Sequence, residues 1–367
     1  MNLPNLQTTA FLVGPERLEL REVPVPTPGE GELLLRVGAA TTCGTDLKVF
    51  QRGGHPRMLK APTPFGHEMA GTVAAVGTGV ERWRVGDRVV VANSAPCLSC
   101  EWCLRGRENL CSDLHYLNGA FSEYLLVPRR FAETATHALP VGLPFEIAAL
   151  AEPLACVLHG LETSALEKAS QVVVYGAGPI GLLFVDVLAN SPADFPADFP
   201  TGSDHHIILA DPNPARLEAG RAIGADETVQ VSRDGGEAAR LRGLSRTGDG
   251  FDLAIEATGS PAAWQDALAS VRPGGLVQLF GGCPPGTTVP LDTYLLHYSE
   301  IAVKSAYHHR PATFRRALDL LASGRLHPEA LLSAERPLAE LEAALRSMRR
   351  REALKVVIRP GERTPRT

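Results

Sequence analysis

A short apolar segment leading into a glycine-rich turn constrains the fold of this chain more than any other feature. Gln171–Tyr175 reads as a buried strand, and the sequence continues Gly176-Ala-Gly-Pro-Ile-Gly181 into an apolar helix that reaches Ala189. Gly176 permits a tight turn, Gly178 lets the backbone approach a pyrophosphate, and Gly181 allows close packing of helix on strand. A purely structural glycine turn is the alternative. The motif predicts a dinucleotide site at Gly176, Gly178, Pro179, Ile180 and Gly181, with the phosphates facing the helix N-terminus.

The segments that follow alternate between strands and helices. Strands are expected at Ile207–Ala210, Glu227–Val231, Phe251–Glu256 and Leu276–Phe280, with helical segments between them such as Pro214–Ile223. This alternation predicts a parallel sheet covered by helices on both faces. The fold class is therefore α/β, with a doubly wound parallel sheet of the Rossmann type.

An acidic residue at the end of the second strand is the candidate partner of the cofactor ribose. Asp211 lies 30 residues after Gly181, whereas the motif usually places this residue about 20 residues on. The doubled segment Pro192-Ala-Asp-Phe195 and Pro196-Ala-Asp-Phe199 accounts for nearly all of the excess, and we interpret it as a surface insertion. A carboxylate there repels a 2′-phosphate and favours NAD over NADP. Arg216 could bind adenosine-side groups and leaves some tolerance for that phosphate.

The part of the chain before this unit is rich in strand patterns. We expect strands at Leu33–Ala40, Ala70–Val76 and Arg88–Ala92, separated by glycine, proline and aspartate turns, and then a helix at Glu146–Thr163. Ala151-Glu152-Pro153 opens or interrupts this helix. After about Tyr298 we expect a strand, a helix and a last strand, at Ile301–Ser305, Pro311–Ser323 and Lys355–Arg359.

Four cysteines are spaced C-x2-C-x2-C-x7-C, at Cys97, Cys100, Cys103 and Cys111. Disulfides are one interpretation. Clustered thiols without a secretion signal instead favour a metal in a reducing compartment. Four thiolates around one zinc make a closed, structural site.

Composition excludes several classes of partner. The chain carries 36 basic and 41 acidic residues, a net charge of −5, with no long run of one sign, so neither nucleic acid nor a membrane surface is an expected partner. No apolar run is long enough for a membrane span, and the N-terminus lacks a signal-peptide pattern. We expect a cytoplasmic protein.

A second set of metal-binding residues completes the pattern. Cys43-Gly-Thr-Asp46, Gly66-His67-Glu68, Gly86-Asp87-Arg88-Val89 and Ala151-Glu152-Pro153 occur in this order around the cysteine cluster and the glycine motif. The chain thereby resembles the zinc-dependent medium-chain dehydrogenase/reductase superfamily, which contains alcohol, polyol (sorbitol) and threonine dehydrogenases. The resemblance runs from Cys43 to Tyr307.

The resemblance implies a division into domains. Residues 1–160 would form a GroES-like, β-rich catalytic domain that carries the structural zinc lobe at residues 93–113. Residues 161–300 would form the Rossmann NAD-binding domain, and residues 301–367 would return to the catalytic domain. In this superfamily the chains usually form dimers or tetramers, so we expect a homo-oligomer.

The resemblance also implies a catalytic zinc, which makes two zinc ions per subunit. Its ligands would be Cys43, His67 and Glu152, since glutamate replaces the third cysteine ligand in the polyol and threonine branch. Cys156 is an alternative ligand, and Glu68 could act as an alternate or water-linked ligand.

Further roles follow from the same resemblance. Thr45 matches the hydroxyl of the proton relay, and Asp46 matches the carboxylate that binds the metal histidine. Lys48 stands where relatives often carry a relay histidine. Three explanations are open: its pKa is lowered, water takes the proton directly, or Lys48 binds a substrate or cofactor group. The nicotinamide half of the cofactor would lie near Ile180, Thr258, Phe280, Gly281, Gly282, Ala306 and Tyr307.

The expected function is an NAD-dependent zinc alcohol/polyol dehydrogenase that moves hydride between a small secondary alcohol (a polyol, cyclitol or sugar-like compound) and NAD. The alternatives are an L-threonine 3-dehydrogenase-like enzyme and an NADPH-dependent ketone reductase. A different class, a non-catalytic NAD- and zinc-binding protein, would require loss of Cys43, His67 or Glu152, and all three are present.

Overall fold

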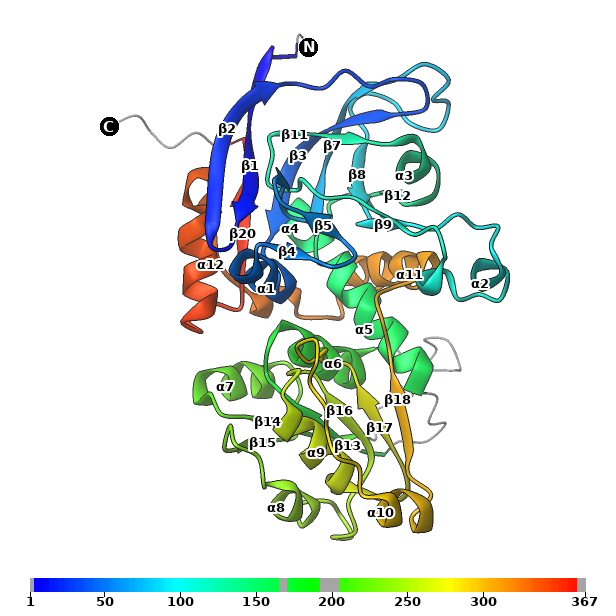
Figure 1. Ribbon diagram of the computed structural model, residues 1–367, viewed down its shortest axis with the longest axis vertical. Helices are drawn as coiled ribbons and strands as arrows, with labels where there is room; N and C mark the ends of the chain where they lie inside the picture. Colours follow the sequence, from blue (N-terminus) through cyan, green and yellow to red (C-terminus); the bar gives the residue numbers. More distant parts are fainter. Residues whose placement is uncertain (1–2, 165–169, 192–204, 362–367) are drawn as a thin grey trace. The chain divides into compact units, whose positions relative to one another are not determined.

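The computed structural model describes residues 3–164, 170–191 and 205–361. The doubled segment at 192–199 lies outside them. The chain divides into two compact units (Figure 1): a first unit of Met1–Glu152, Arg310–Ala322 and Leu331–Thr367, and a second unit of Pro153–His309 and Ser323–Ala330.

The first unit is built on a seven-stranded sheet. Its strand order is β12 (Thr136–Ala138), β8 (Arg88–Val91), β7 (Met69–Val76), β3 (Leu33–Thr41), β20 (Lys355–Arg359) and β19 (Leu332–Pro337), and β11 (Tyr124–Val127) also pairs with β3. The pairs are antiparallel except β19 with β20. β3 lies in the middle of this sheet and ends at Thr41. Thr42 and Cys43 follow it and connect this buried strand to helix α1 (Gly44–Arg52).

Smaller elements complete the first unit. One is a three-stranded sheet with the order β2 (Arg17–Pro24), β1 (Leu6–Gly14) and β6 (Thr63–Pro64). Two further sheets have two short strands each: β4 (Gly54–His55) with β5 (Leu59–Lys60), and β9 (Ser94–Ala95) with β10 (His115–Tyr116). The helices include α2 (Glu101–Leu104), α3 (Arg129–Thr134), α4 (Phe145–Ala148), α11 (Pro311–Ala322) and α12 (Leu341–Arg349).

The helix expected at Glu146–Thr163 is wrong as a single element. The structure has α4, then a turn at residues 149–150, then α5 (Ala151–Ser164). Proline is tolerated in the first turn of a helix, where its missing N–H leaves no bond unmade. The restart at Ala151 places Pro153 in such a first turn, and it places Glu152 there as well.

The second unit contains a six-stranded parallel sheet. The strand order is β15 (Glu227–Gln230), β14 (His206–Asp211), β13 (Gln171–Tyr175), β16 (Phe251–Glu256), β17 (Val271–Leu279) and β18 (Ala302–Ser305). When the six strands are numbered as they occur along the chain, their order in the sheet is 3-2-1-4-5-6. This is the doubly wound arrangement, and it confirms the expected fold class. The helices are α6 (Pro179–Asn190), α7 (Pro214–Ala222), α8 (Ala238–Arg242), α9 (Pro261–Ser270) and α10 (Thr293–Tyr298).

The carboxyl ends of the central strands form one edge of this sheet. Every residue of β13 and β16 is buried, as expected for parallel strands covered on both faces. In doubly wound sheets, ligands bind outside these carboxyl ends, where the strand order reverses. Here the reversal lies between β13 and β16.

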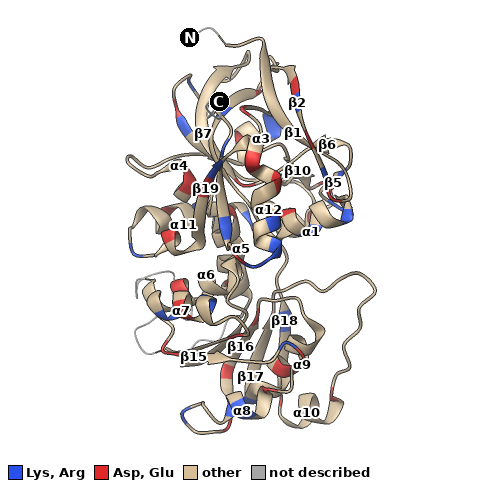
Figure 2. Ribbon diagram, turned by 90° about the vertical axis from the view of Figure 1, so that its left-hand side faces the viewer, with Lys and Arg blue, Asp and Glu red and all other residues tan. Residues whose placement is uncertain are grey.

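Acidic and basic residues are interspersed along the ribbons of both units (Figure 2), in keeping with the net charge of −5. Among the helices that the structure describes, none has the length and apolar character needed to cross a membrane.

Candidate zinc and cofactor sites

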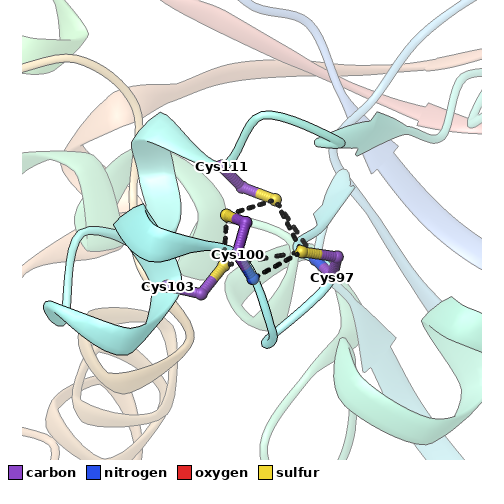
Figure 3. Close-up of side chains that lie close together, drawn as sticks. All are labelled: Cys97, Cys100, Cys103 and Cys111. Atoms are coloured by element: carbon purple, nitrogen blue, oxygen red, sulfur yellow. Dashed lines mark hydrogen bonds between the residues drawn. The ribbon is translucent and has the colours of Figure 1, made fainter.

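The four clustered cysteines converge around one point (Figure 3). They come from the loop around α2, and neighbouring sulfur atoms are separated by 3.5 Å (Cys100–Cys103, Cys97–Cys111) to 4.0 Å (Cys97–Cys103). Disulfide bonds, at about 2.05 Å, do not fit these separations. Four sulfurs on one tetrahedral zinc, with Zn–S bonds of about 2.3 Å, would be about 3.8 Å apart. The residues therefore fit a zinc ion.

Backbone N–H groups donate hydrogen bonds to sulfur atoms of this cluster, and these bonds stabilise negative charge on the sulfurs. The N–H groups of Cys97 and Asp113 donate to Cys111 Sγ at 3.3 and 3.4 Å, and the N–H of Cys100 donates to Cys97 Sγ at 3.3 Å. Backbone hydrogen bonds lower the pKa of Cys100 to about 5, whereas burial raises the pKa of Cys103 to about 12. Such donors favour the thiolate form, which is the form that binds metal.

Cys43 lies at the N-cap of α1. Its sulfur accepts the N–H of Thr45 at 3.4 Å, while its own N–H donates to the Asp46 carboxylate at 2.9 Å. This reciprocal pair is a capping box built with cysteine. It fixes the orientation of the Cys43 side chain at the helix start.

Asp46 also holds His67. Asp46 Oδ1 lies 2.9 Å from His67 Nδ1, and both side chains are buried. With the proton on Nδ1, the other ring nitrogen, Nε2, is left as the metal ligand. Burial lowers the pKa of His67, but Asp46, and then Cys43, outweigh this and raise it well above its usual value.

Ligand atoms of Cys43, His67 and Glu68 lie within 4.8 Å of one another. Glu68 is completely buried, and its two oxygens face Lys355 Nζ at 2.9 Å (Oε1) and 2.6 Å (Oε2). The hydroxyl of Thr41 also donates to Glu68 Oε2. Thr41 and Lys355 were not predicted as site residues, because each comes from a strand with no motif of its own.

Glu152 occupies the first turn of α5 and is 7% exposed. Its Oε1 accepts a hydrogen bond from Asn93 Nδ2 at 3.0 Å. Burial raises the pKa of Glu152 to about 7, with smaller effects from the charges of His67, Glu68 and Lys355. Asn93 is another residue that the sequence analysis missed, and its position as the first residue of the lobe at 93–113 was the one available signal.

The charges in this cluster favour a bound cation. Three buried carboxyl groups (Asp46, Glu68 and Glu152) are present against the ammonium group of Lys355 and the imidazole of His67, and the imidazole must be neutral to bind a metal. Buried charge is costly unless it is paired or coordinates a metal. A thiol, an imidazole nitrogen and a carboxylate are the ligand types of catalytic zinc. The residues therefore fit a zinc ion here too.

The glycine motif has the geometry of a phosphate-binding turn. Gly176 has φ +102°, and a Cβ there would lie 2.6 Å from Thr258 Cγ2. A Cβ on Gly181 would lie 1.7 Å from the carbonyl oxygen of Gly176, whereas a Cβ on Gly178 would meet no atom within 4 Å. Gly178 thus faces open space at the start of α6, where Ile180 and Gly181 of the first turn have no intrahelical acceptor for their N–H groups. This is space that a pyrophosphate can use.

Asp211 closes this turn from the neighbouring strand. It is the last residue of β14, and its Oδ2 accepts the N–H of Ala177 at 2.7 Å, while Oδ1 accepts the N–H of Asn213 at 2.7 Å. The carboxylate therefore lies beside the glycine motif, despite the long connection between them. Arg216 lies in the first turn of α7 and is partly buried.

The turns after β16 and β17 are held together by Glu256. Its carboxylate accepts the N–H groups of Thr258 at 2.7 Å and Gly259 at 2.9 Å, and also the Thr258 hydroxyl. Its carbonyl oxygen accepts the N–H groups of Phe280 and Gly281 at 3.0 and 2.9 Å. Glu256, another residue that the sequence analysis missed, thus joins the segments that contain Thr258 and Phe280–Gly282.

The remaining predicted residues are placed as follows. Thr45 lies in the first turn of α1, next to Cys43. Lys48 is exposed on the same helix and forms no ion pair with any residue that the structure describes. Pro179 is the first residue of α6, and Ala306 and Tyr307 directly follow β18.

Comparison with known proteins identifies the family. Two family descriptions match: "Alcohol dehydrogenase GroES-like domain" over residues 29–137 and "Zinc-binding dehydrogenase" over residues 201–323. Sorbitol dehydrogenase from Bacillus subtilis (strain 168) is 32% identical over 367 residues, covering 98% of this chain and 99% of that protein. The chain belongs to the zinc-dependent medium-chain dehydrogenase superfamily.

Other members of the superfamily are similar over most of their length. L-threonine 3-dehydrogenase from Pyrococcus horikoshii is 30% identical over 345 residues, covering 92% of this dehydrogenase and 94% of that protein. The crystal structure of a zinc-binding dehydrogenase from Sinorhizobium meliloti 1021 bound to NADP has a TM-score of 0.85 at 28% identity, covering 97% of this chain and all of that chain (100%).

This dehydrogenase is therefore an oxidoreductase of the zinc-dependent alcohol/polyol type. It binds zinc through a structural four-cysteine cluster and a catalytic Cys/His/Glu site, and it acts on a small molecule with a nicotinamide cofactor.

Proposed function

We propose that this enzyme oxidises a secondary alcohol of a polyol, cyclitol or sugar-like compound and passes the hydride to NAD. The proposal rests on Glu152, a buried carboxylate in the first turn of α5. By the resemblance, its motif corresponds to the position at which the alcohol dehydrogenases have a cysteine ligand. With Cys43 and His67 it would hold the catalytic zinc with one thiolate and one carboxylate. Such a site is formally neutral and has an open fourth position.

Each residue near this site has a proposed task. Zinc supplies Lewis acidity that makes an alcohol hydroxyl more acidic, and NAD supplies the hydride acceptor. Asp46 keeps the proton of His67 on Nδ1, so that Nε2 stays available to the metal. The Thr45 hydroxyl would accept the substrate proton and pass it on. The exposed ammonium group of Lys48, one helical turn further along α1, would lie near the end of that route.

We propose NAD as the cofactor because of Asp211. Its carboxylate lies beside the glycine motif, where it would accept hydrogen bonds from ribose hydroxyls and repel a 2′-phosphate. The similar protein from Sinorhizobium meliloti was crystallised with NADP. Measuring the activity of this enzyme with NAD and with NADP therefore tests the cofactor proposal directly. We expect kcat/KM to be higher with NAD than with NADP; a clear preference for NADP would contradict the assignment.

The substrate class is tested with a panel of polyols, cyclitols, simple secondary alcohols and L-threonine, followed by the absorbance of the reduced cofactor. We expect turnover of polyhydroxy compounds. L-Threonine is the second candidate, since threonine and sorbitol dehydrogenases are similar to this chain at nearly equal identity. Faster turnover of L-threonine than of every polyol would favour that alternative.

The metal content is part of the proposal. We expect two zinc ions per chain by elemental analysis. Removing the more weakly held ion with a chelator should abolish activity and leave the fold in place. Full activity in protein that contains no zinc would contradict the mechanism.

We also propose that the chain forms a homo-oligomer through the edge of the parallel sheet. β18 is one of the two outer strands of this sheet, and all four of its residues are exposed. An exposed strand edge pairs readily with another strand, and a second copy of β18 offers the same edge. Light scattering should report at least a dimer, and V303K should shift the population toward monomer; an unchanged mass would place the contact elsewhere.

Finally, we propose the domain division 1–160, 161–300 and 301–367, with the last part joining the first domain. Limited proteolysis followed by mass spectrometry tests it. Cleavage should occur outside the regular elements on either side of the two boundaries, because residue 160 itself lies inside helix α5.

A further inference from the structure

A surface pocket in the first unit is not used by the mechanism above. It has a volume of about 540 Å³ and lies where the loop before β8 meets the loop after β12. The two strands are antiparallel neighbours, with Ala138 opposite Val89, and the N–H of Leu139 donates to the carbonyl of Arg88 at 2.9 Å. Pockets of roughly 300–1,000 Å³ have the size that small molecules occupy.

This pocket is separate from the metal-binding region of the same unit. Arg88, which lines the pocket, is the first residue of β8, whereas Asn93, which binds Glu152, follows the other end of that strand. None of the described residues that line the pocket belongs to the metal-binding or cofactor residues discussed above. A molecule bound here would therefore not occupy the place of the substrate or of the cofactor.

Two arginine side chains that line the pocket lie against aromatic rings. The guanidinium carbon of Arg82 lies 4.7 Å from the centre of the Trp83 ring, and that of Arg88 lies 4.5 Å from the centre of the Phe145 ring. Guanidinium groups stack on aromatic faces through cation–π attraction, which restricts their rotation. Both arginines are thus held in position before any ligand arrives.

Backbone carbonyls add a second contact to each arginine. Arg82 Nη1 donates to the carbonyl of Glu133 at 3.2 Å, and Arg88 Nη2 donates to the carbonyl of Leu143 at 2.6 Å. A guanidinium group has five N–H donors, so most donors of each group remain for other acceptors. Neither arginine forms an ion pair with a carboxylate of any residue that the structure describes.

The charge around the pocket is predominantly positive. Asp87 is the one acidic residue among the described residues that line it, and its Oδ2 already accepts the backbone N–H of Arg84 at 2.8 Å. Burial lowers the pKa of the nearby His137, and the positive charges of Arg315 and Arg82 lower it further. Two guanidinium groups against one carboxylate leave a net positive charge, which attracts anions.

We propose that this pocket binds a small molecule through a phosphate or carboxylate group, at a site distinct from those of the substrate and the cofactor. The planar guanidinium group matches both kinds of oxyanion with paired hydrogen bonds. Arg82 and Arg88 would hold the oxyanion, while Leu139 and Val141 would contact the apolar part of the ligand. The site uses no residue of the proposed zinc and cofactor sites, so its test is independent of the proposed function.

The test is isothermal titration calorimetry with inorganic phosphate and, separately, with succinate. Excess NADH is present throughout, so that phosphate does not bind at the glycine motif. We expect the wild type to bind at least one of the two anions, and the anion that binds identifies the oxyanion that the site prefers. R82Q should weaken this binding about tenfold or more, because hydrogen bonds from a charged group to the anion are lost.

R84Q is the matched control. Arg84 is exposed in the same loop but does not line the pocket, so R84Q changes the net charge equally and should keep the wild-type affinity. R88K keeps the charge but loses the planar group, and it should also weaken binding. It provides the second measurement if R82Q lowers Tm.

Two results would overturn the proposal. One is a wild-type protein that binds neither phosphate nor succinate. The other is an equal loss of affinity in R82Q and R84Q, which would show attraction by the overall charge and not a site at Arg82.

Discussion

At the scale of single residues, the metal-binding region depends on a few side chains that bind other side chains. Asp46 contacts both Cys43 and His67, and Asn93 contacts Glu152. Hydrogen bonds of this kind orient the ligands of a metal and tune its affinity. Changes at these residues should therefore appear first as altered metal affinity.

Asp46→Asn should weaken zinc binding. The amide keeps the shape of the side chain but loses the charge that orients His67, and loss of such a partner typically costs about 10- to 100-fold in metal affinity. Competition with a chromogenic chelator measures the effect. Asp186→Asn is a matched control, because Asp186 holds His327 at 3.0 Å in the second unit. Equal zinc affinity in D46N and wild type would contradict the role of Asp46.

His137 should make the fold sensitive to acid. It is 8% exposed, its ring stacks on Phe314 at 5.2 Å, and its Nε2 has no hydrogen-bond partner among the described residues. Burial lowers the pKa of His137 from 6.5 to about 4. Between these values the unfolded chain binds a proton that the folded chain does not, so stability falls as pH drops from 6.5 toward 4, by about 3 kcal/mol in total.

His137→Phe removes this titration and keeps an aromatic ring against Phe314. The loss of Tm between pH 7 and pH 5 should be smaller in H137F than in the wild type. Identical losses would show that another group controls the acid sensitivity.

At the scale of elements, the turn between β13 and α6 separates two roles of glycine. A Cβ at Gly181 would lie 1.7 Å from the Gly176 carbonyl, whereas a Cβ at Gly178 would meet open space. We therefore expect Gly181 to be needed for packing of the helix on the strand, and Gly178 to be needed for access of a ligand.

Gly181→Ala should lower stability, by about 1–3 kcal/mol or more, because backbone atoms must move. Gly178→Ala should leave Tm nearly unchanged and weaken NADH binding, because its methyl group occupies the space for the pyrophosphate. Differential scanning fluorimetry and NADH fluorescence titration distinguish the two. A stable G181A, or a G178A with full NADH affinity, would contradict this assignment.

The elements also show what could be predicted from the sequence. The strand Gln171–Tyr175 and the helix after it were predicted because the motif, the apolar run and the helix start are adjacent in sequence. Ala151-Glu152-Pro153 indicated that the later helix is opened or interrupted there, and α5 does begin at Ala151. The end of α4 was not predicted, because the sequence has no glycine or proline at residues 149–150. Packing, and not local sequence, places that break.

At the scale of the whole molecule, the site residues that escaped prediction come from distant segments. Lys355 is 287 residues from Glu68, and Asn93 is 59 residues from Glu152. A lysine at the start of an apolar strand has no spacing pattern that connects it to Gly66-His67-Glu68. Cys43, His67 and Glu152 were predicted as ligands only through a resemblance to a family, which supplied long-range information that the sequence pattern lacks.

The four-cysteine cluster should support folding before it supports catalysis. Replacing Cys97 with Ala leaves three sulfurs for the metal, and structural zinc contributes directly to folding free energy. We expect C97A to lose about one zinc per chain and to have a lower Tm, with activity lost as the protein unfolds or fails to assemble. Cys283→Ser is the control outside both metal sets. Loss of turnover in a C97A protein of unchanged stability and assembly would refute the structural role.

The pairing of β20 with β3 has a consequence for biosynthesis. Glu68 and its neighbours leave the ribosome long before Lys355, and at 5–20 residues per second the interval is roughly 15 to 60 s. During that interval Glu68 has no ammonium partner. Its buried carboxylate gains this counter-charge only when β20 pairs with β3, so this part of the first unit reaches its final charge balance only after the last strand has been made.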